Sequence, residues 1–297
     1  MLADCLGALP GAIVTPESQF IDTIRLAFNK NQSFRALERA MDSSRFKVWR
    51  IDRRDLRYNE STNFRDAVSQ VLALYASKNS SGPNIDLWID HTPNNFKRSH
   101  LLKEIFPNAK FIHIIRDPRA VIASVLQLDW GPDTITRATR WWLQETSYGL
   151  AHELAYPESC LRVKYEDLVV ADRFFWKNLI SSIDPNTKIE NFERFISGGN
   201  STVPKYTVKQ HSHVGKGPNL NRIYAWKNKL SDRQIEIIEA DLGSMMRALG
   251  YETFTDFPSK ATRFEKLKDF DWPIEIRIQL AKRLKKKIRE NFHRSSL

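Results

Sequence analysis

The chain has 297 residues, 41% of them hydrophobic, with a formal net charge of +11 and only two cysteines. This length suits one large α/β domain or two small ones. The mean hydropathy of −0.47 and the lack of any apolar run near roughly 18 residues argue against a transmembrane helix. Cys5 and Cys160 are too few and too scattered for a disulfide framework or a zinc site. We therefore expect a reducing, cytoplasmic compartment and no metal requirement.

Much of the positive charge lies near the C-terminus, where AKRLKKKIRENFHRSSL at 281–297 holds seven lysines or arginines and one glutamate. Such a segment can contact an anionic membrane surface or nucleic acid, although it is more often a solvated helix end. We expect no nucleic-acid partner and at most a weak membrane contact. The opening MLADCLGALPGAIV lacks the basic start of a signal peptide, so none is expected.

Helix-like and strand-like segments alternate along the chain. Apolar periodicity predicts helices over 17–30, 66–77, 96–105, 134–154 and 231–248. Short apolar runs predict strands over 85–90, over 111–115 and, with a following turn, over 160–168, while 45–52 fits a short strand or a helix edge. Turn residues predict loops over 78–84, 130–133 and 197–222. The alternation predicts an α/β fold with a central parallel sheet flanked by helices.

The stretch KFIHIIRDPRAVIAS at 110–124 combines a buried strand, a very short turn and a helix. Asp117 suits the N-cap of that helix and Pro118 its first position. We interpret His113, inside the strand, as a satisfied core histidine. Arg116 stands at the strand end, where ligands of parallel α/β folds bind, so it could grip a phosphate. It could equally pair with a nearby acid such as Asp117.

Polar side chains also follow the other predicted strands. His91 to Asn94 follow one strand, and Tyr165 to Asp167 follow another. A late loop places Lys216 between two glycines, which let backbone N–H groups approach a phosphate. Taken together in an α/β order, these features predict a nucleotide site.

Several segments, in the expected order, resemble the sulfotransferases that use 3′-phosphoadenosine 5′-phosphosulfate (PAPS). IIRDPRAVIAS is similar to the family's 3′-phosphate motif, RVKYEDL to its next strand and turn, and VGKGPNLNRIYAWKNKLS to its late Gly-Lys-Gly segment. PESQF resembles the segment that carries a catalytic glutamate in many members, and DHTPNN resembles a turn beside the acceptor. The resemblance covers roughly residues 1–252 and implies the P-loop NTPase-like architecture of sulfotransferases.

The resemblance also implies roles for residues in the donor site. Arg116 and Ser124 correspond to the positions that bind the 3′-phosphate, and Tyr165 to the tyrosine beside the adenine pocket. The late segment, which closes over the cofactor, carries three further candidates: Lys216, Gly217 and Arg222. Ser124 could instead bond back to its own helix, and Lys216 could belong to a solvated loop.

Two residues are candidates for the base that removes a proton from the acceptor. Glu17 matches the family's glutamate, and His91 stands where a lysine is frequent. Glu17 could instead be an acid at a helix start, and His91 a turn histidine or an acceptor contact. We interpret Trp141 and Trp142 as core residues rather than base-stacking ones.

One part of the family pattern is missing. Nothing in the chain matches the N-terminal strand and Gly/Ser/Thr-rich loop that bind the 5′-phosphosulfate, and no G-x-x-x-x-G-K-[ST] pattern occurs. The opening MLADCLGALPGAIVTPESQF instead resembles the helix after that loop and the turn behind it. We expect a sulfotransferase-like domain over 1–255 without its first strand and donor loop, followed by a basic helical tail over 256–297.

The expected activity is PAPS-dependent transfer of a sulfuryl group to a hydroxyl or amine, leaving adenosine 3′,5′-bisphosphate. The acceptor could be a small molecule, a carbohydrate or a protein tyrosine. The alternative is a non-catalytic module, or a truncated fragment, that keeps the fold and binds a nucleotide or a partner.

Overall fold

A computed structural model describes residues 1–21, 25, 41–42, 44–57, 63–79, 85–187, 189, 191–197 and 219–267. The chain divides into two compact units, each built from two stretches of sequence. Unit 1 comprises Met1–Arg116 with Glu145–Ile223, and unit 2 comprises Asp117–Gln144 with Tyr224–Leu297. The predicted boundary between residues 255 and 256 stays a prediction.

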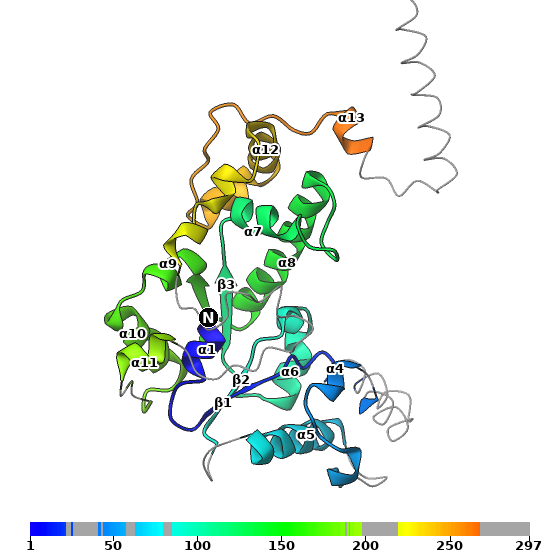
Figure 1. Ribbon diagram of the computed structural model, residues 1–297, viewed down its shortest axis with the longest axis vertical. Helices are drawn as coiled ribbons and strands as arrows, with labels where there is room; N and C mark the ends of the chain where they lie inside the picture. Colours follow the sequence, from blue (N-terminus) through cyan, green and yellow to red (C-terminus); the bar gives the residue numbers. More distant parts are fainter. Residues whose placement is uncertain are drawn as a thin grey trace, which may run out of the picture. The chain divides into compact units, whose positions relative to one another are not determined.

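The strands of unit 1 pair in parallel, as the alternating pattern predicts. Figure 1 shows β1 (Ala12–Thr15) beside β2 (Leu87–Asp90). The other pair joins β3 (Phe111–Ile115) to β4 (Cys160–Lys164). Within the described residues the pairs form two two-stranded sheets rather than one continuous central sheet. The sequence analysis missed β1, which it interpreted as a turn behind the first helix.

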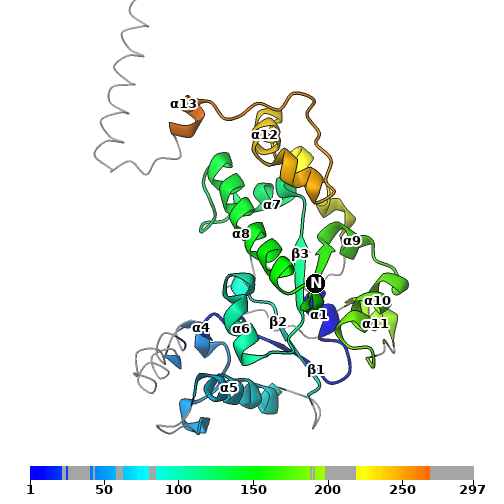
Figure 2. The ribbon, with the colours of Figure 1, turned by 180° about the vertical axis from the view of Figure 1, so that it is seen from behind.

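Two apolar clusters support these sheets. One joins Ile13 of β1 and Phe111 of β3 to an aromatic group in which Phe20, Trp49 and Tyr75 meet edge to face. The other packs α1 and β4 against α10 and α11, which lie together in both views (Figures 1 and 2). Because each sheet contributes to a cluster on either side, its strands are apolar through most of their length.

The described helices of unit 1 come from both of its sequence stretches. They are α1 (Leu2–Leu6), α4 (Ser44–Lys47), α5 (Phe64–Asn79), α6 (Ser99–Ile105), α9 (Tyr165–Val170), α10 (Arg173–Ile183) and α11 (Phe192–Ser197). In the described part of unit 1, four 3-10 helices accompany them at Arg53–Asp55, Pro93–Arg98, Pro157–Ser159 and Leu220–Arg222. Helix α8 (Ile135–Ala155) crosses the sequence boundary between the units at Gln144 and Glu145.

Most predicted helices are confirmed, with shifted ends. The segment 66–77 lies within α5, and 96–105 divides into a 3-10 helix and α6 because Pro93 starts a tighter turn. The helix predicted from residue 17 starts too early, since residues 17–20 are not helical. Residues 45–47 are the end of helix α4 and no residue of 45–52 is in a strand, so the helix-edge alternative is confirmed. Most of 17–30 and of the loop 197–222 lies outside the described residues.

Unit 2 contains α7 (Pro118–Val125), the first half of α8, a 3-10 helix at Ala225–Asn228, α12 (Asp232–Ala248) and α13 (Arg263–Lys266). Asp117 caps α7 by accepting the Arg119 N–H, as predicted, and Pro118 is its first residue. Trp142 is buried and Trp141 is half-buried, which agrees with a packing role. None of the helices described is long and apolar enough to cross a membrane.

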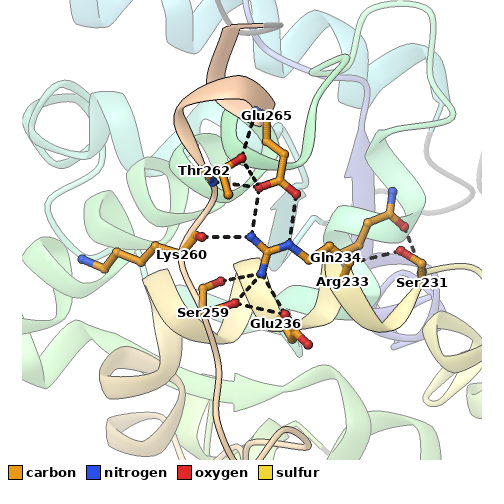
Figure 3. A network of polar contacts seen from close by, with 8 residues as sticks. All are labelled: Ser231, Arg233, Gln234, Glu236, Ser259, Lys260, Thr262 and Glu265. Carbon is orange, nitrogen blue, oxygen red and sulfur yellow. Dashed lines mark hydrogen bonds and ion pairs between the residues drawn. The ribbon is translucent and has the colours of Figure 1, made fainter.

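Arg233 fastens the segment after α12 back onto that helix (Figure 3). Its guanidinium pairs with Glu236 at 2.7 Å and Glu265 at 2.9 Å, and donates to the carbonyl of Lys260 at 2.9 Å. It also donates to both oxygens of Ser259. Hydrogen bonds from Arg233 and Thr262 lower the pKa of Glu265 to about 2. We call this group the Arg233 clamp.

The Arg233 clamp predicts how the segment 252–267 responds to protease. Arg233→Ala removes every bond that joins residues 259, 260 and 265 to α12 through this side chain, so we expect faster tryptic cleavage after Lys260. Arg247→Ala, on the last turn of the same helix, is the matched control. Mass spectrometry of limited digests measures the rate, and equal rates in all three proteins would contradict the role of the clamp.

Candidate functional site

Three of the predicted donor-site residues lie together at the carboxyl end of the β3–β4 pair. The last partners in this pair are Ile115 and Lys164, so Arg116 and Tyr165 follow neighbouring strand ends. The guanidinium carbon of Arg116 lies 4.4 Å from the centre of the Tyr165 ring. Its Nη2 donates to the carbonyl oxygen of Arg222 at 2.8 Å. The parallel register therefore explains why residues so distant in sequence meet.

These contacts fix the orientation of the Arg116 guanidinium before any ligand arrives. A guanidinium stacked on an aromatic face is delocalised and weakly hydrated, and its planar fork matches a phosphate bidentately. Because its orientation is set by Tyr165 and Arg222, less rotamer freedom is lost when an anion binds. The chemistry of this group fits a phosphate beside an aromatic ring, as in a nucleotide.

The other donor-site candidates are placed less completely. Ser124 is half-buried on α7, in unit 2. Lys216 and Gly217 lie outside the described residues. Their roles, and those of Arg116, Tyr165 and Arg222, stay predictions.

The two candidate bases follow the ends of the β1–β2 pair. Thr15 and Asp90 are the last partners of this pair, with Glu17 two residues after β1 and His91 directly after β2. Glu17 is half-buried, and its carboxylate accepts a hydrogen bond from Gln19 Nε2 at 2.7 Å. His91 is exposed. The register thus carries both groups to one edge of this sheet, where a proton acceptor could face a substrate.

A buried polar network at the same edge was not found from the sequence. Ser18, Thr92 and Arg98 are at most 4% exposed, and the Asp90 carboxylate accepts from the Ser18 hydroxyl and from Thr92. The segment Asp90-His91-Thr92 forms an Asx turn, in which the Thr92 N–H donates to Asp90 Oδ1 at 2.8 Å. An aspartate at the start of a turn is a sequence signature of this arrangement. That signature could have indicated Asp90 and Thr92. The burial of Arg98 had no sequence signal, since the residue stands in a polar stretch.

A charged group of the buried His113, the half-buried Glu153 and the exposed Arg162 supports the β3–β4 pair. His113 and Arg162 are register partners, and both bond to Glu153 of α8, with His113 Nδ1 2.5 Å from Glu153 Oε1. Burial lowers the pKa of His113 despite this partner. Burial would raise the pKa of Glu153, but the hydrogen bonds from Arg162 and His113 hold it below its usual range. The interpretation of His113 as a satisfied core histidine is confirmed.

Gly149 makes this arrangement possible. A Cβ at this position of α8 would stand 2.2 Å from the His113 ring, so any side chain there would force the ring or the helix to move.

The parallel strand pairs, with polar and cationic groups at their carboxyl ends, define an α/β protein. Comparison with known families gives the class: the sulfotransferase family matches residues 1–183. The match covers more than half of the chain, so the chain belongs to the sulfotransferase family.

Curated relatives of this chain include proteins named protein-tyrosine sulfotransferases. The protein-tyrosine sulfotransferase of Drosophila melanogaster is 23% identical over 223 residues, 70% of this chain and 43% of that protein. Protein-tyrosine sulfotransferase A of Caenorhabditis elegans is 27% identical over 181 residues, 56% of this chain and 45% of that protein. The chain therefore spans less than half the length of these relatives.

Solved structures agree on the fold. The sulfotransferase domain from the Synechococcus PCC 7002 olefin synthase superposes with a TM-score of 0.56 at 19% identity. The likeness covers 84% of this chain and 90% of that domain. The α/β sulfotransferase fold predicted from the sequence is confirmed.

Proposed function

We propose that this chain transfers a sulfuryl group from PAPS to a hydroxyl or amine acceptor. The observation that carries the proposal is the match of the sulfotransferase family over residues 1–183. The meeting of Arg116 and Tyr165 at neighbouring strand ends supports it, because that pair has the chemistry a nucleotide phosphate requires.

The chain's own residues would bind the donor through its nucleotide. Arg116 would hold the 3′-phosphate, and Tyr165 would border the adenine. The carbonyl of Arg222 accepts a hydrogen bond from Arg116. Arg222, Lys216 and Gly217 would be the donor-binding residues of the late segment. An arginine held in place by Tyr165 and the Arg222 carbonyl would distinguish a nucleotide that carries a 3′-phosphate from one that lacks it.

At the β1–β2 edge, Glu17 is the proposed base and His91 the second candidate. When bound, PAPS would supply the sulfuryl group: its S–O bond to the donor phosphate would break as an S–O bond to the acceptor oxygen forms. The hydroxyl proton passes to the Glu17 carboxylate, which Gln19 orients. As in phosphoryl transfer, such a step needs positioning and charge stabilisation more than covalent catalysis.

The acceptor we favour is a tyrosine in a protein. The support is that the Drosophila and Caenorhabditis relatives are both named protein-tyrosine sulfotransferases. A phenol also suits a carboxylate or imidazole base, because it loses its proton more readily than an aliphatic alcohol.

Calorimetric titration with adenosine 3′,5′-bisphosphate tests the donor site, with 5′-AMP as the comparison ligand. We expect a preference for the bisphosphate of about tenfold or more, as one charged bidentate contact provides. Arg116→Ala is expected to abolish the preference. Arg54→Ala is the matched control, because Arg54 is an exposed arginine of the same unit that pairs with Asp52.

Circular dichroism must show that each variant is folded. A folded parent protein that binds both nucleotides equally, or neither, would contradict the proposed function. A preference that survives in Arg116→Ala would assign the 3′-phosphate to another residue.

A further inference from the structure

The loops that carry Glu17 and His91 are joined by a direct hydrogen bond. Ser18, the residue after Glu17, donates its backbone N–H to the hydroxyl of Thr92 at 2.7 Å. Thr92 is the residue after His91 and donates that same hydroxyl to Asp90 Oδ1 at 2.5 Å. The two candidate bases are therefore each one residue away from a shared buried contact.

Arg98 holds this contact from the other side. Its Nη1 donates to the Ser18 carbonyl at 2.7 Å, and its Nη2 donates to the Ser18 hydroxyl at 2.8 Å. Nη2 also donates to Asn95 Oδ1 at 2.9 Å. The Asn95 Nδ2 in turn donates to the backbone carbonyl of Asp90. The planar guanidinium of Arg98 thus bonds at the same time to the loop that follows Glu17 and to the turn after β2.

The residue type matters at this position. Arg98 is 4% exposed, so its charge is buried among polar groups of two chain segments. A lysine keeps the charge, but a single ammonium cannot present a rigid fork to both oxygens of Ser18 and to Asn95. An uncharged residue would leave these oxygens without their donors, which is costly inside a protein.

We infer that Arg98 is a positioning residue: it acts through Ser18 and Thr92 to fix the separation of Glu17 and His91. The inference rests on the proposed function in assigning these two residues to the acceptor. The hydrogen bonds described for Arg98 all go to the loops beside Glu17 and His91, so we expect it to act on the rate of transfer and not on donor affinity. A shift of the base by about 1 Å can cost roughly a hundredfold in rate.

Amide hydrogen exchange tests the structural part without any substrate. Thr92→Val removes the acceptor of the Ser18 N–H with little change of shape, and Arg98→Lys removes the fork. We expect the Ser18 amide to exchange about tenfold faster in Thr92→Val, which is the loss of one net hydrogen bond, and also faster in Arg98→Lys, because the fork no longer holds the Ser18 carbonyl and hydroxyl. Lys97→Met is the control, since Lys97 neighbours Arg98 but pairs with Glu145 at 2.5 Å. Unchanged Ser18 exchange in both variants would overturn the inference.

Steady-state transfer from PAPS to a synthetic peptide with a single tyrosine tests the kinetic part. For Arg98→Lys and Thr92→Val we expect kcat to fall about tenfold to a hundredfold while KM for PAPS stays within about twofold. A parallel change in kcat and KM would indicate general structural damage and overturn the positioning role. A folded parent protein that fails to transfer would contradict the proposed function, whereas Ser18 exchange would still decide whether Arg98 joins the two loops.

Discussion

Replacing Arg119 with methionine is expected to lower the free energy of unfolding by about 3–5 kcal/mol. Arg119 is 6% exposed and pairs with Asp117 at 2.7 Å and with Glu239 at 2.6 Å. Burial would lower its pKa, but these two carboxylates raise it above its usual value. Methionine keeps much of the packing on Trp226, whose ring lies 4.1 Å from the guanidinium. The loss is therefore mainly electrostatic, because two carboxylates lose their buried cation.

Glu239 makes the effect reach beyond one ion pair. Its carboxylate also accepts from the backbone N–H groups of Phe254 and Thr255, at 2.8 and 2.7 Å. Arg119 on α7 and the segment after α12 thus share one buried carboxylate. Without the arginine, this carboxylate is held by backbone dipoles alone, which compensate a buried charge poorly.

Urea denaturation of the parent, Arg119→Met and a matched control measures the loss. The control is Arg137→Met, because Arg137 pairs with the exposed Asp133 on the same unit and should cost below about 1 kcal/mol. Combining Arg119→Met with Asp117→Asn and Glu239→Gln should recover part of the stability, since no uncompensated charge then remains. A cost for Arg119→Met no larger than that of the control would contradict the argument.

Stability should also fall as the pH drops below the usual pKa of histidine. His152 is 3% exposed and its ring lies 4.1 Å from Phe111, with Phe96 and Tyr156 beside it. Neither of its ring nitrogens has a hydrogen-bond partner among the described residues. Burial lowers the pKa of His152, and the charge of Lys103 lowers it further, whereas Glu153 acts in the opposite direction.

The direction of the effect follows from which state binds the proton. The unfolded chain protonates its histidines near pH 6.5, whereas folded His152 stays neutral to a lower pH. The stability that the neutral ring contributes is therefore complete above about pH 6.5 and is lost as the pH falls. The slope approaches about 1.4 kcal/mol per pH unit for each such histidine. His113, whose pKa burial also lowers, adds a second contribution.

His152→Phe should remove one of these contributions. We expect the variant to lose less stability between pH 7 and pH 5 than the parent, by at most about 2 kcal/mol. His100→Phe, at an exposed position of α6, should keep the slope of the parent. Urea denaturation at half-unit pH steps gives the slopes, and identical slopes for the parent and His152→Phe would refute the buried neutral state.

The features that the sequence predicted well depend on local chemistry. An apolar run, Asp117 and Pro118 specify a strand, a cap and a helix within fifteen residues, and the structure has all three. Parallel pairing then brings Arg116 and Tyr165 together, because residues that follow adjacent strand ends must meet. The gathering of these two candidates could therefore be predicted without coordinates.

The features that the sequence did not predict depend on distant contacts. β1 has four residues, and its apolar pattern is too short to separate from a turn until β2 pairs with it. The buried state of Arg98 depends on Ser18, which is 80 residues away. Whether the four strands form one sheet or two pairs depends on how they pack against the apolar clusters. The sequence pattern of each strand does not show which arrangement forms.

The interleaving of the two units has a consequence for the order in which the chain is made. The stretch Asp117–Gln144 belongs to unit 2 but is synthesised between the two stretches of unit 1. Unit 1 has its full sequence once Ile223 has been added. At that point α12, which belongs to the same unit as α7, has not yet been synthesised. Until the ribosome reaches Glu239, Arg119 has only one of its two buried carboxylate partners among the described residues. Unit 2 can thus be completed only after unit 1 has its full sequence, and no single cut in the chain yields both units whole.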